Sequence, residues 1–528
     1  MSAISRRAFL RHAASLSALG TAAPLGLSLS AIGMGAAQAS QSNYKALVCI
    51  FLYGGNDAYN TLLCNDSASW TDYNNHRNPA TRSFSDNSTS LALMPLGTPP
   101  APQAILGSPS RLGGVLSLEL GANGLNAGRS VALHPLLPDV AQLYGQGRLA
   151  ALANVGPLTQ ALDAAQYAGA LTPRPAKLFS HNDQQSTWQS FSPEGAGSGW
   201  GGRMGDLLMS RNGLSMGALT PLVQQSLTCI SPTGNGLWLT GDQSRALQVG
   251  NESIASLGQA ANWMGQASLQ ADLVSMMTTG GNNLFALDHQ AIAQRAVNAQ
   301  SLLGSVLPAQ AQAPWGTPGI GSAWQDPLMS YTSPLSETAR TNPLAIQLQM
   351  VARLIEANRS GQLGLQRQVF MVSLGGFDTH GSQNQEHADR MAQLNHALAY
   401  FDTALGQMPG GDMRSQVTTF TASDFGRSLT NNGDGTDHGW GGHHFIMGGA
   451  VQGGSVYGKL PQYATADGSG HFDSPDLIDN GAMLPSTSVD QYAYTLGRWM
   501  DVPDTELRGI LPNLANFDTG THNLGFMG

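Results

Sequence analysis

Uninterrupted apolar runs of strand length recur along the chain. Residues 44–53 (YKALVCIFLY) form a continuous run of this kind, and 148–155, 368–374 and 417–421 are predicted to be further strands. This pattern is typical of strands that other elements cover on both sides of a sheet. Residues 445–451 (FIMGGAV) form a further run, for which we predict another strand.

Helical periodicity lies between these runs. Met391, Leu394, Leu398, Phe401 and Leu405 recur at three- and four-residue spacing, which predicts a helix over 386–408 with one apolar stripe. Shorter helices are predicted at 139–146, 180–188 and 345–357. Strand, helix and strand in alternation favour an α/β fold with a doubly wound, mostly parallel sheet. The turn-rich segment 66–126 is predicted to be a surface excursion.

The first 39 residues differ from the rest. Ser5-Arg6-Arg7-Ala8-Phe9-Leu10 has the form of a twin-arginine signature, and Ala37-Gln38-Ala39 that of a cleavage site. We therefore expect a signal peptide over 1–39 that engages the twin-arginine export machinery, an anchoring helix being the alternative. The mature protein would then be periplasmic or extracellular, with no stable membrane span after cleavage. Residues 40–528 are predicted to form one α/β domain with a helical insertion at about 242–312.

Composition narrows the possible partners. The net charge is −9, only 11% of residues are charged, and no segment is rich in Lys or Arg. These properties argue against nucleic acid or an anionic membrane as a partner. The chain has three cysteines, and a Cys64–Cys229 disulfide is conceivable but cannot be inferred from spacing.

Chemistry-bearing residues concentrate in one segment. Residues 423–444 read SDFGRSLTNNGDGTDHGWGGHH, and six glycines there separate three carboxylates and three imidazoles. Glycine permits close backbone approach, and Asp and His together ligate divalent metals. The acids are Asp424, Asp434 and Asp437, and the imidazoles are His438, His443 and His444.

Two other strand ends carry similar residues. Asp57 follows the first apolar run, and Asp378 and His380 follow the run at 368–374. The ends of parallel strands meet at one edge of a sheet, so these residues and Asp424 are predicted to lie together there. The alternatives are an Asx turn at Asp57 and a helix cap at Asp378.

Two further candidates have two interpretations each, and one adjacent pair of histidines is limited by its geometry. Arg427 could clamp an anionic substrate oxygen or be the structural partner of Asp424. Ser180 could be a nucleophile at a helix N-terminus or simply an N-cap. His443 and His444 are adjacent and lead into a strand, so they should face opposite ways and at most one should bind a metal.

These residues lie in segments that resemble the DUF1501 family, which we place in the alkaline phosphatase-like superfamily. The resemblance rests on FLYGGNDAYNTLL (51–63), 133–156, SHNDQQSTW (180–188), 199–208, GGFDTH (375–380) and TASDFGRSLTNNGDGTDHGWGG (421–442). It implies a doubly wound sheet and a two-metal site that cleaves phosphate or sulfate esters. Asp57, Asp378 with His380, and His438 would be metal ligands, and Ser180 would be the nucleophile.

The chain departs from that pattern at two points. Phe425 stands where phosphatase relatives carry the His of an Asp-His pair, and no C/S-x-P-x-R sulfatase motif is present. Asp437 and His438 could supply the pair instead, leaving His443 or His444 as the final ligand.

The sequence thus predicts an exported metal-dependent hydrolase of phosphoric or related sulfuric esters, acting on a small anionic substrate. One or two divalent ions (Zn, Mn, Mg or Ca) would be held there, with Ser180 and Arg427 as catalytic residues. The predicted ligands are Asp57, Asp378, His380, Asp424, Asp437, His438 and His443. The alternative is a non-catalytic exported protein whose degenerate metal site binds a ligand or glycan.

Overall fold

The computed structural model describes most of the chain after the predicted signal peptide. The described residues are 43–78, 89–121, 124–169, 173–212, 226–234, 236–250, 268–279, 283–310, 312–317, 326–361 and 363–528. The twin-arginine and cleavage motifs lie outside them.

A mostly parallel sheet forms the centre of the molecule. Its strand order is β15-β5-β14-β11-β1-β10-β6-β7, with β18 paired to β5 as a ninth strand in the described part of the chain. β1 pairs in parallel with both β10 and β11. The strands are β1 (Lys45–Leu52), β5 (Leu149–Gly156), β6 (Cys229–Ser231), β7 (Leu247–Gln248), β10 (Arg367–Leu374), β11 (Val417–Ser423), β14 (Gly442–Met447), β15 (Val456–Tyr457) and β18 (Thr487–Ser488).

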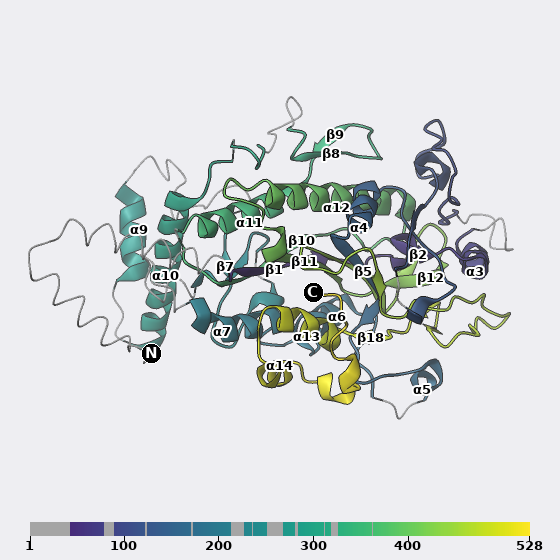
Figure 1. Cartoon of the computed structure of the whole chain (residues 1–528). Helices are drawn as coiled ribbons and strands as arrows, with labels where there is room; N and C mark the ends of the chain where they lie inside the picture. The colour runs from purple at the N-terminus through teal and green to yellow at the C-terminus, as the bar shows by residue number, and fades with distance from the viewer. Residues whose placement is uncertain are drawn as a thin grey trace, which may run out of the picture.

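Helices cover both faces of this sheet (Figure 1). On β1, Val48 and Ile50 enter the apolar cluster beneath α11 and α12, whereas Cys49 and Phe51 enter the cluster on the opposite face. Burial on both faces is why β1 is apolar without alternation. The covering helices are α4 (Pro138–Gly145), α11 (Pro343–Arg359) and α12 (Gln383–Gly406) on one side, and α6 (His181–Ser190), α7 (Trp200–Asn212), α13 (Val489–Trp499) and α14 (Asp504–Ile510) on the other.

Smaller elements surround this core. The described helices include α3 (Ser67–Arg77), α5 (Ala164–Ala168), and, within the predicted insertion, α9 (Ser268–Thr278) and α10 (Leu284–Val306). Small sheets are formed by β2 (Leu62–Cys64), β3 (Leu116–Leu118) and β4 (Val131–Leu133), by β8 (Ser330–Thr332) and β9 (Ala339–Thr341), by β12 (Arg427–Asn431) and β13 (Thr436–His438), and by β16 (Leu477–Ile478) and β17 (Ala482–Met483).

Three local predictions need correction. Residues 66–126 are not only a surface excursion, because they hold α3 and β3 and place Arg77 fully inside the protein. β14 begins at Gly442 rather than 445, so His443 and His444 lie within the strand. It runs antiparallel to β11, because residues 424–441 return as the β12–β13 ribbon without a crossover helix. The glycine-rich segment is therefore paired structure rather than an open loop.

None of the three cysteines forms a disulfide. Cys49, Cys64 and Cys229 are free and buried, and Cys64 and Cys229 belong to the clusters on opposite faces of the sheet.

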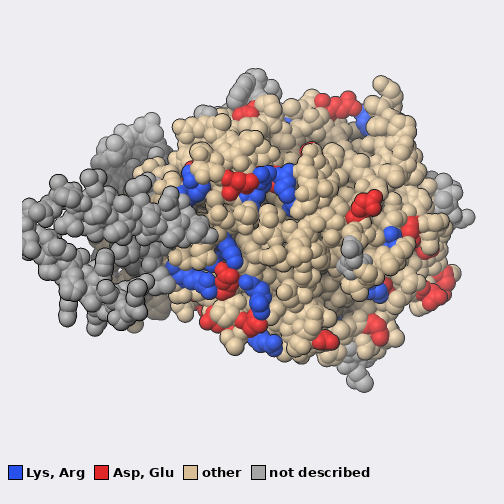
Figure 2. Space-filling view, in the orientation of Figure 1, with Lys and Arg blue, Asp and Glu red and all other residues tan. Residues whose placement is uncertain are grey.

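On the face shown in Figure 2, acidic and basic side chains lie near one another in small groups, and broad uncharged areas separate these groups. Among the described helices, none has both the length and the apolar character needed to traverse a bilayer.

Asp490 on α13 should make stability depend on pH. Its carboxylate is 1% exposed and accepts from Asn513 N at 2.9 Å, and burial raises its pKa to about 7. The unfolded chain has a pKa of about 3.9 there. Between these two pKa values the folded state binds more protons than the unfolded state. The contribution of Asp490 to the free energy of unfolding therefore falls as pH rises, by about 4 kcal/mol in total.

The measurement compares denaturant unfolding of wild type and Asp490→Asn at steps from pH 4 to pH 8. We expect the wild type to lose stability relative to the variant as pH rises through this window. A free-energy difference that stays constant with pH would contradict the assignment.

Candidate metal centre

Three side chains from distant segments meet beyond the carboxyl ends of β10 and β11. The potential ligand atoms of His181, Asp378 and His438 all lie within 4.8 Å of one another. Asp378 follows β10, His438 ends β13, and His181 begins α6. The strand-end prediction therefore placed Asp378 correctly, and folding brings in an imidazole from residues 180–188.

The His181 ring is held by Asp424, which directly follows β11. The Asp424 Oδ2 atom lies 2.8 Å from His181 Nδ1 and also accepts from Gln185 Nε2 at 2.7 Å. This leaves His181 Nε2 buried without a hydrogen-bond partner, 3.3 Å from Asp378 Oδ2. A carboxylate that orients the far nitrogen of an imidazole is the usual arrangement behind a metal-binding histidine.

His438 is oriented in the same way by the main chain. Its Nδ1 atom lies 2.6 Å from the Phe179 carbonyl oxygen, which can only accept, so Nδ1 carries the proton. In the neutral ring the Nε2 atom of His438 then carries no proton, and it lies 3.3 Å from Asp378 Oδ1. Two imidazoles thus direct their Nε2 atoms to one carboxylate.

His380 completes the group from the more exposed side. Its Nε2 atom is 3.0 Å from Asp378 Oδ1 and 2.9 Å from His438 Nε2. Asp437 is peripheral, because its Oδ1 lies 3.6 Å from His380 Nδ1 and accepts from Asn432 Nδ2 at 2.9 Å. Asp434 instead accepts from the Ser382 backbone amide.

Arg427 positions Asp378 rather than standing free for a substrate. Its guanidinium is fully buried and donates to Asp378 Oδ1 at 2.7 Å and to the Gly54 carbonyl at 3.3 Å. The remaining contacts are with the hydroxyl and carbonyl of Thr436. The structural alternative is therefore the better description, although the partner is Asp378 and not Asp424.

Asp57 lies at the predicted edge but faces away from the three imidazoles. Both its oxygens bind Arg77, at 2.6 and 3.1 Å, inside a fully buried ion pair. Gln383 Nε2 donates to Asp57 Oδ2 at 2.6 Å, and the side-chain oxygen Oε1 of Gln383 accepts from the Thr436 hydroxyl. Since Thr436 also contacts Arg427, Asp57 supports the centre through a buried chain of hydrogen bonds. We leave it out of the ligand set.

His443 and His444 point to opposite faces of the sheet, as adjacency predicts. The His443 Nδ1 atom accepts from Asn154 N at 2.9 Å, and the His444 ring packs against Trp188 at 5.5 Å. Burial lowers the pKa of His443 to about 4 and that of His444 to about 3. Both are therefore neutral core residues at neutral pH, and neither joins the cluster.

The glycines before Asp57 are required by close contacts. Gly54 and Gly55 have positive φ angles of 113° and 84°. A Cβ on Gly54 would stand 2.4 Å from the Asp378 backbone nitrogen, and one on Gly55 would stand 2.4 Å from the Phe425 ring. These two positions let the segment that carries Asp378 and the ring of Phe425 approach the end of β1.

Phe425 forms an apolar wall of the centre. Its ring centroid lies 4.9 Å from that of His181 and 4.7 Å from that of His438. An aromatic ring thus occupies the space beside these imidazoles, where it offers no ligand atom to a second ion.

Electrostatics favour the ionised acid and a neutral imidazole in this group. Burial raises the pKa of Asp378, but the hydrogen bond and charge of Arg427 outweigh it and the net pKa is lowered. Burial lowers the pKa of His438. The hydrogen bond to Asp424 raises the pKa of His181, against the effect of burial.

A cavity of about 400 Å³ opens beside the cluster. Phe179, His380, Asp437 and His438 line it together with residues of the β16–β17 turn. Ser180 stands next to His181 in the chain, and its hydroxyl does not cap α6. Instead the hydroxyl donates to Asp183 Oδ2 at 2.9 Å.

His181 is the member of this group that sequence reasoning missed. The strand-end argument searched the sheet, whereas His181 comes from the first turn of a helix. The signal was available, because SHNDQQSTW contains this histidine directly beside the candidate nucleophile.

Comparison with known proteins establishes the family. The model of a protein family of unknown function, DUF1501, matches residues 44–511. The chain belongs to the DUF1501 family. The match includes β1, the α6 segment, Asp378 and the β12–β13 ribbon, so the whole centre is built within the family region.

Other comparisons are weak. No curated protein matches the chain in sequence. The crystal structure of Ps i-CgsB is similar with a TM-score of 0.28 and 9% identity, covering 72% of this chain and 71% of the other. The same protein in complex with k-i-k-neocarrahexaose gives a TM-score of 0.26 and 10% identity over the same shares. At these values neither likeness supports an argument about activity.

Proposed function

We propose that this DUF1501 protein is an exported, metal-dependent hydrolase of phosphoric or sulfuric esters. One divalent ion would be held by Asp378 and by the Nε2 atoms of His181, His380 and His438. The observation that carries the proposal is that Asp424 and the Phe179 carbonyl fix the Nδ1 atoms of two of these imidazoles. Both Nε2 atoms are thereby directed to one carboxylate.

The donor set fits zinc best. Imidazole nitrogen and one carboxylate oxygen suit Zn²⁺, whereas Mg²⁺ and Ca²⁺ prefer oxygen ligands. Ligand atoms around a tetrahedral zinc ion stand roughly 3.3–3.6 Å apart. Asp378 Oδ2 lies 3.3 Å from His181 Nε2, and Asp378 Oδ1 lies 3.3 Å from His438 Nε2, both close to this value. His380 Nε2 is nearer, at 3.0 Å from Asp378 Oδ1 and 2.9 Å from His438 Nε2. The buried, unpartnered Nε2 of His181 would gain its partner on binding.

The residues have distinct parts in the proposed reaction. A bound ion would act as a Lewis acid on the ester oxygen. Arg427 holds Asp378 in its ionised form and in place. Ser180 is the candidate nucleophile: its oxygen would bond to the phosphorus or sulfur while its hydrogen passes to Asp183, which already accepts it. The bond to the ester oxygen would break, and the alcohol would leave with that proton. Water would then hydrolyse the serine ester, which releases phosphate or sulfate and restores Ser180.

We further propose one ion rather than two, within an alkaline phosphatase-like arrangement of the sheet. Phe425 and the Asp57–Arg77 pair support this number, since they occupy positions where the resemblance implies ligands for a second site. The ester class itself follows from the resemblance of the motifs, and export follows from the twin-arginine signature.

The test is metal analysis followed by turnover. Purified mature protein is expected to hold about one zinc per chain and to hydrolyse members of a panel of phosphomonoesters, phosphodiesters and sulfate esters. Chelation should abolish turnover, and zinc should restore it more fully than magnesium or calcium. Stoichiometric metal without turnover on any ester would instead favour the non-catalytic alternative, and absence of metal would refute the centre.

A further inference from the structure

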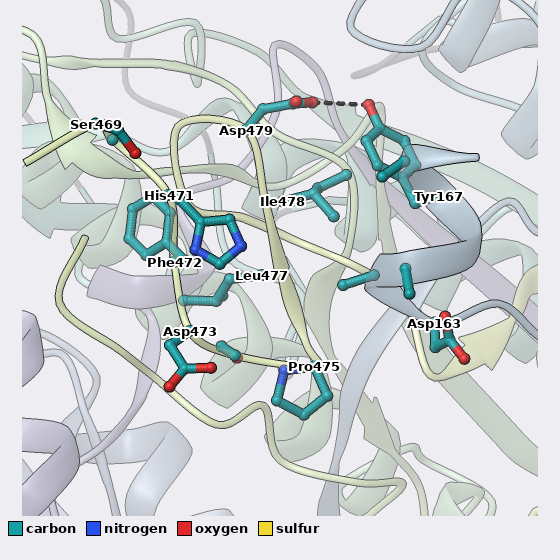
Figure 3. A pocket seen from close by; sticks show the side chains of 15 residues that line it. Asp163, Tyr167, Ser469, His471, Phe472, Asp473, Pro475, Leu477, Ile478 and Asp479 are labelled. Carbon is teal, nitrogen blue, oxygen red and sulfur yellow. Dashed lines mark hydrogen bonds between the residues drawn. The ribbon is translucent and has the colours of Figure 1, made fainter. Parts of the chain in front are cut away.

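A second, larger cavity adjoins the one at the metal centre. It measures about 850 Å³, and Asp479 lines both it and the 400 Å³ cavity beside His438. Figure 3 shows the larger cavity between α5 and the segment that runs from Ser469 to Asp479. The two cavities therefore meet at one side chain.

Hydrogen bonds hold the residue at the boundary between the two cavities in place. Asp479 lies at the tip of the β16–β17 hairpin with a φ of 44°, and the Tyr167 hydroxyl of α5 donates to its carboxylate at 2.7 Å (Figure 3). The backbone amides of Leu429 and Thr430 hold the hairpin turn to β12, the strand that begins with Arg427. The wall of the larger cavity is thus hydrogen-bonded to the strand that carries Arg427.

The lining has the chemistry of a site for an uncharged, hydroxyl-rich molecule. Carboxylates of Asp163, Asp473 and Asp479 offer hydrogen-bond acceptors, and the accessible Tyr167, Ala168 and Pro475 provide apolar surface. Among the described residues, the lining includes no Lys or Arg. Sugars present hydroxyl donors at their edges and C–H groups on their faces, and such a mixture of acceptors and apolar surface suits both.

We propose that the two cavities form one substrate cleft, in which the larger one binds neutral sugar residues next to the ester that reacts at the centre. This inference rests on the proposed function, because it assigns the alcohol part of the same substrate. Acidic lining would repel further phosphate or sulfate groups, so nucleotides and densely sulfated chains are disfavoured. The single anionic ester would lie at the cation, and the neutral portion would extend past Asp479.

Substitutions of Tyr167 give the most direct test of the proposed cleft. Its ring packs against Trp440 at 6.1 Å, and the Arg174 guanidinium lies 4.8 Å from the ring centroid. Tyr167→Ala removes a wall of the cavity, and Tyr167→Phe removes only the bond to Asp479. Tyr457→Ala is the matched control, since Tyr457 is also half-buried but lines neither cavity.

The experiment has a binding arm and a turnover arm. Wild-type protein and the variants are applied to an array of neutral, singly sulfated and singly phosphorylated oligosaccharides, and the best-bound member is titrated by calorimetry. We expect Tyr167→Ala to weaken binding at least tenfold, Tyr167→Phe to weaken it less, and Tyr457→Ala to leave it unchanged. In the turnover arm, Tyr167→Ala should raise KM for a sugar ester at least tenfold without changing that for a 4-nitrophenyl ester.

The outcomes separate this inference from the proposed function. Oligosaccharide binding that depends on Tyr167 and survives Asp378→Asn would support the cleft even if no ester is turned over. Binding to no array member, or binding that Tyr167→Ala leaves intact, would overturn it. Preferential binding of a lysine-rich peptide, lost on Asp473→Asn, would also overturn it in favour of a cationic ligand. Thermal unfolding of each variant confirms that a loss is local.

Discussion

Replacing Asp378 is expected to remove both the bound metal and the ester turnover. All three imidazoles face this carboxylate, with Nε2 distances of 3.3 Å from His181, 3.0 Å from His380 and 3.3 Å from His438. A metal acting as Lewis acid supplies several kcal/mol of transition-state stabilisation. Losing about 4 kcal/mol corresponds to a fall in kcat/KM of roughly a thousandfold.

The choice of substitution decides whether the result can be interpreted. Asp378 also neutralises the buried Arg427, so Asp378→Ala leaves an unpaired buried charge and lowers stability. Asp378→Asn keeps an oxygen that accepts from Arg427 while it removes the ligand's charge. Metal content and turnover are therefore measured on Asp378→Asn, with folding checked by thermal unfolding.

Asp434→Asn is the matched control for this experiment. Asp434 lies in the same glycine-rich segment, but its side chain accepts from a backbone amide and touches none of the four proposed ligands. We expect this variant to keep its metal and its turnover. An Asp378→Asn protein that retained wild-type zinc content and activity would show that the acid is not a ligand.

Arg77→Leu is expected to destabilise the protein by about 3–5 kcal/mol. Arg77 and Asp57 are both fully buried and joined by two hydrogen bonds of 2.6 and 3.1 Å. Arg77 also donates to the backbone carbonyls of Ser428 and Leu429. Removing the cation leaves a carboxylate inside the protein without its counter-charge, and two β12 carbonyls lose their donor.

The measurement is denaturant unfolding of Arg77→Leu beside Arg498→Leu. Arg498 makes a comparable 2.6 Å contact with Asp504, but the two side chains are 48% and 44% exposed, and such surface pairs contribute less than about 1 kcal/mol. The double variant Asp57→Leu with Arg77→Leu should recover part of the loss, because no isolated charge remains. Equal effects of the two arginine substitutions would contradict this account of Asp57.

The position of the centre could be predicted from the sequence, but its membership only in part. Asp378 and His380 follow an apolar run, and the pairing of β1, β10 and β11 sets the residues after these strands at one edge. Asp57 also follows one of these strands, but its side chain faces away from the imidazoles. Its partner Arg77 lies in a segment whose turn-like composition hides α3, so a local pattern could not reveal the ion pair.

Sequence reasoning did not single out His181, which lies in the centre, and it did single out His443, which lies outside it. Nothing in the helical pattern of 180–188 distinguishes His181 from a surface residue, yet α6 brings it within 2.8 Å of Asp424. His443 lies in the segment with the densest metal-binding residues, and strand pairing with β5 buries it beside Asn154. Residue type and spacing thus named most members of this side-chain group but could not tell them from core residues.

Sequence alone determined the apolar strands, the helices between them, the mostly parallel α/β class and the family. These depend on local periodicity and on motifs, which are properties of short segments. The tertiary structure decided which way each polar side chain points, that Arg427 supports Asp378, and that Asp479 joins two cavities. The direction of a side chain is set by partners hundreds of residues away, such as the Phe179 carbonyl for His438. No pattern within one segment contains that information.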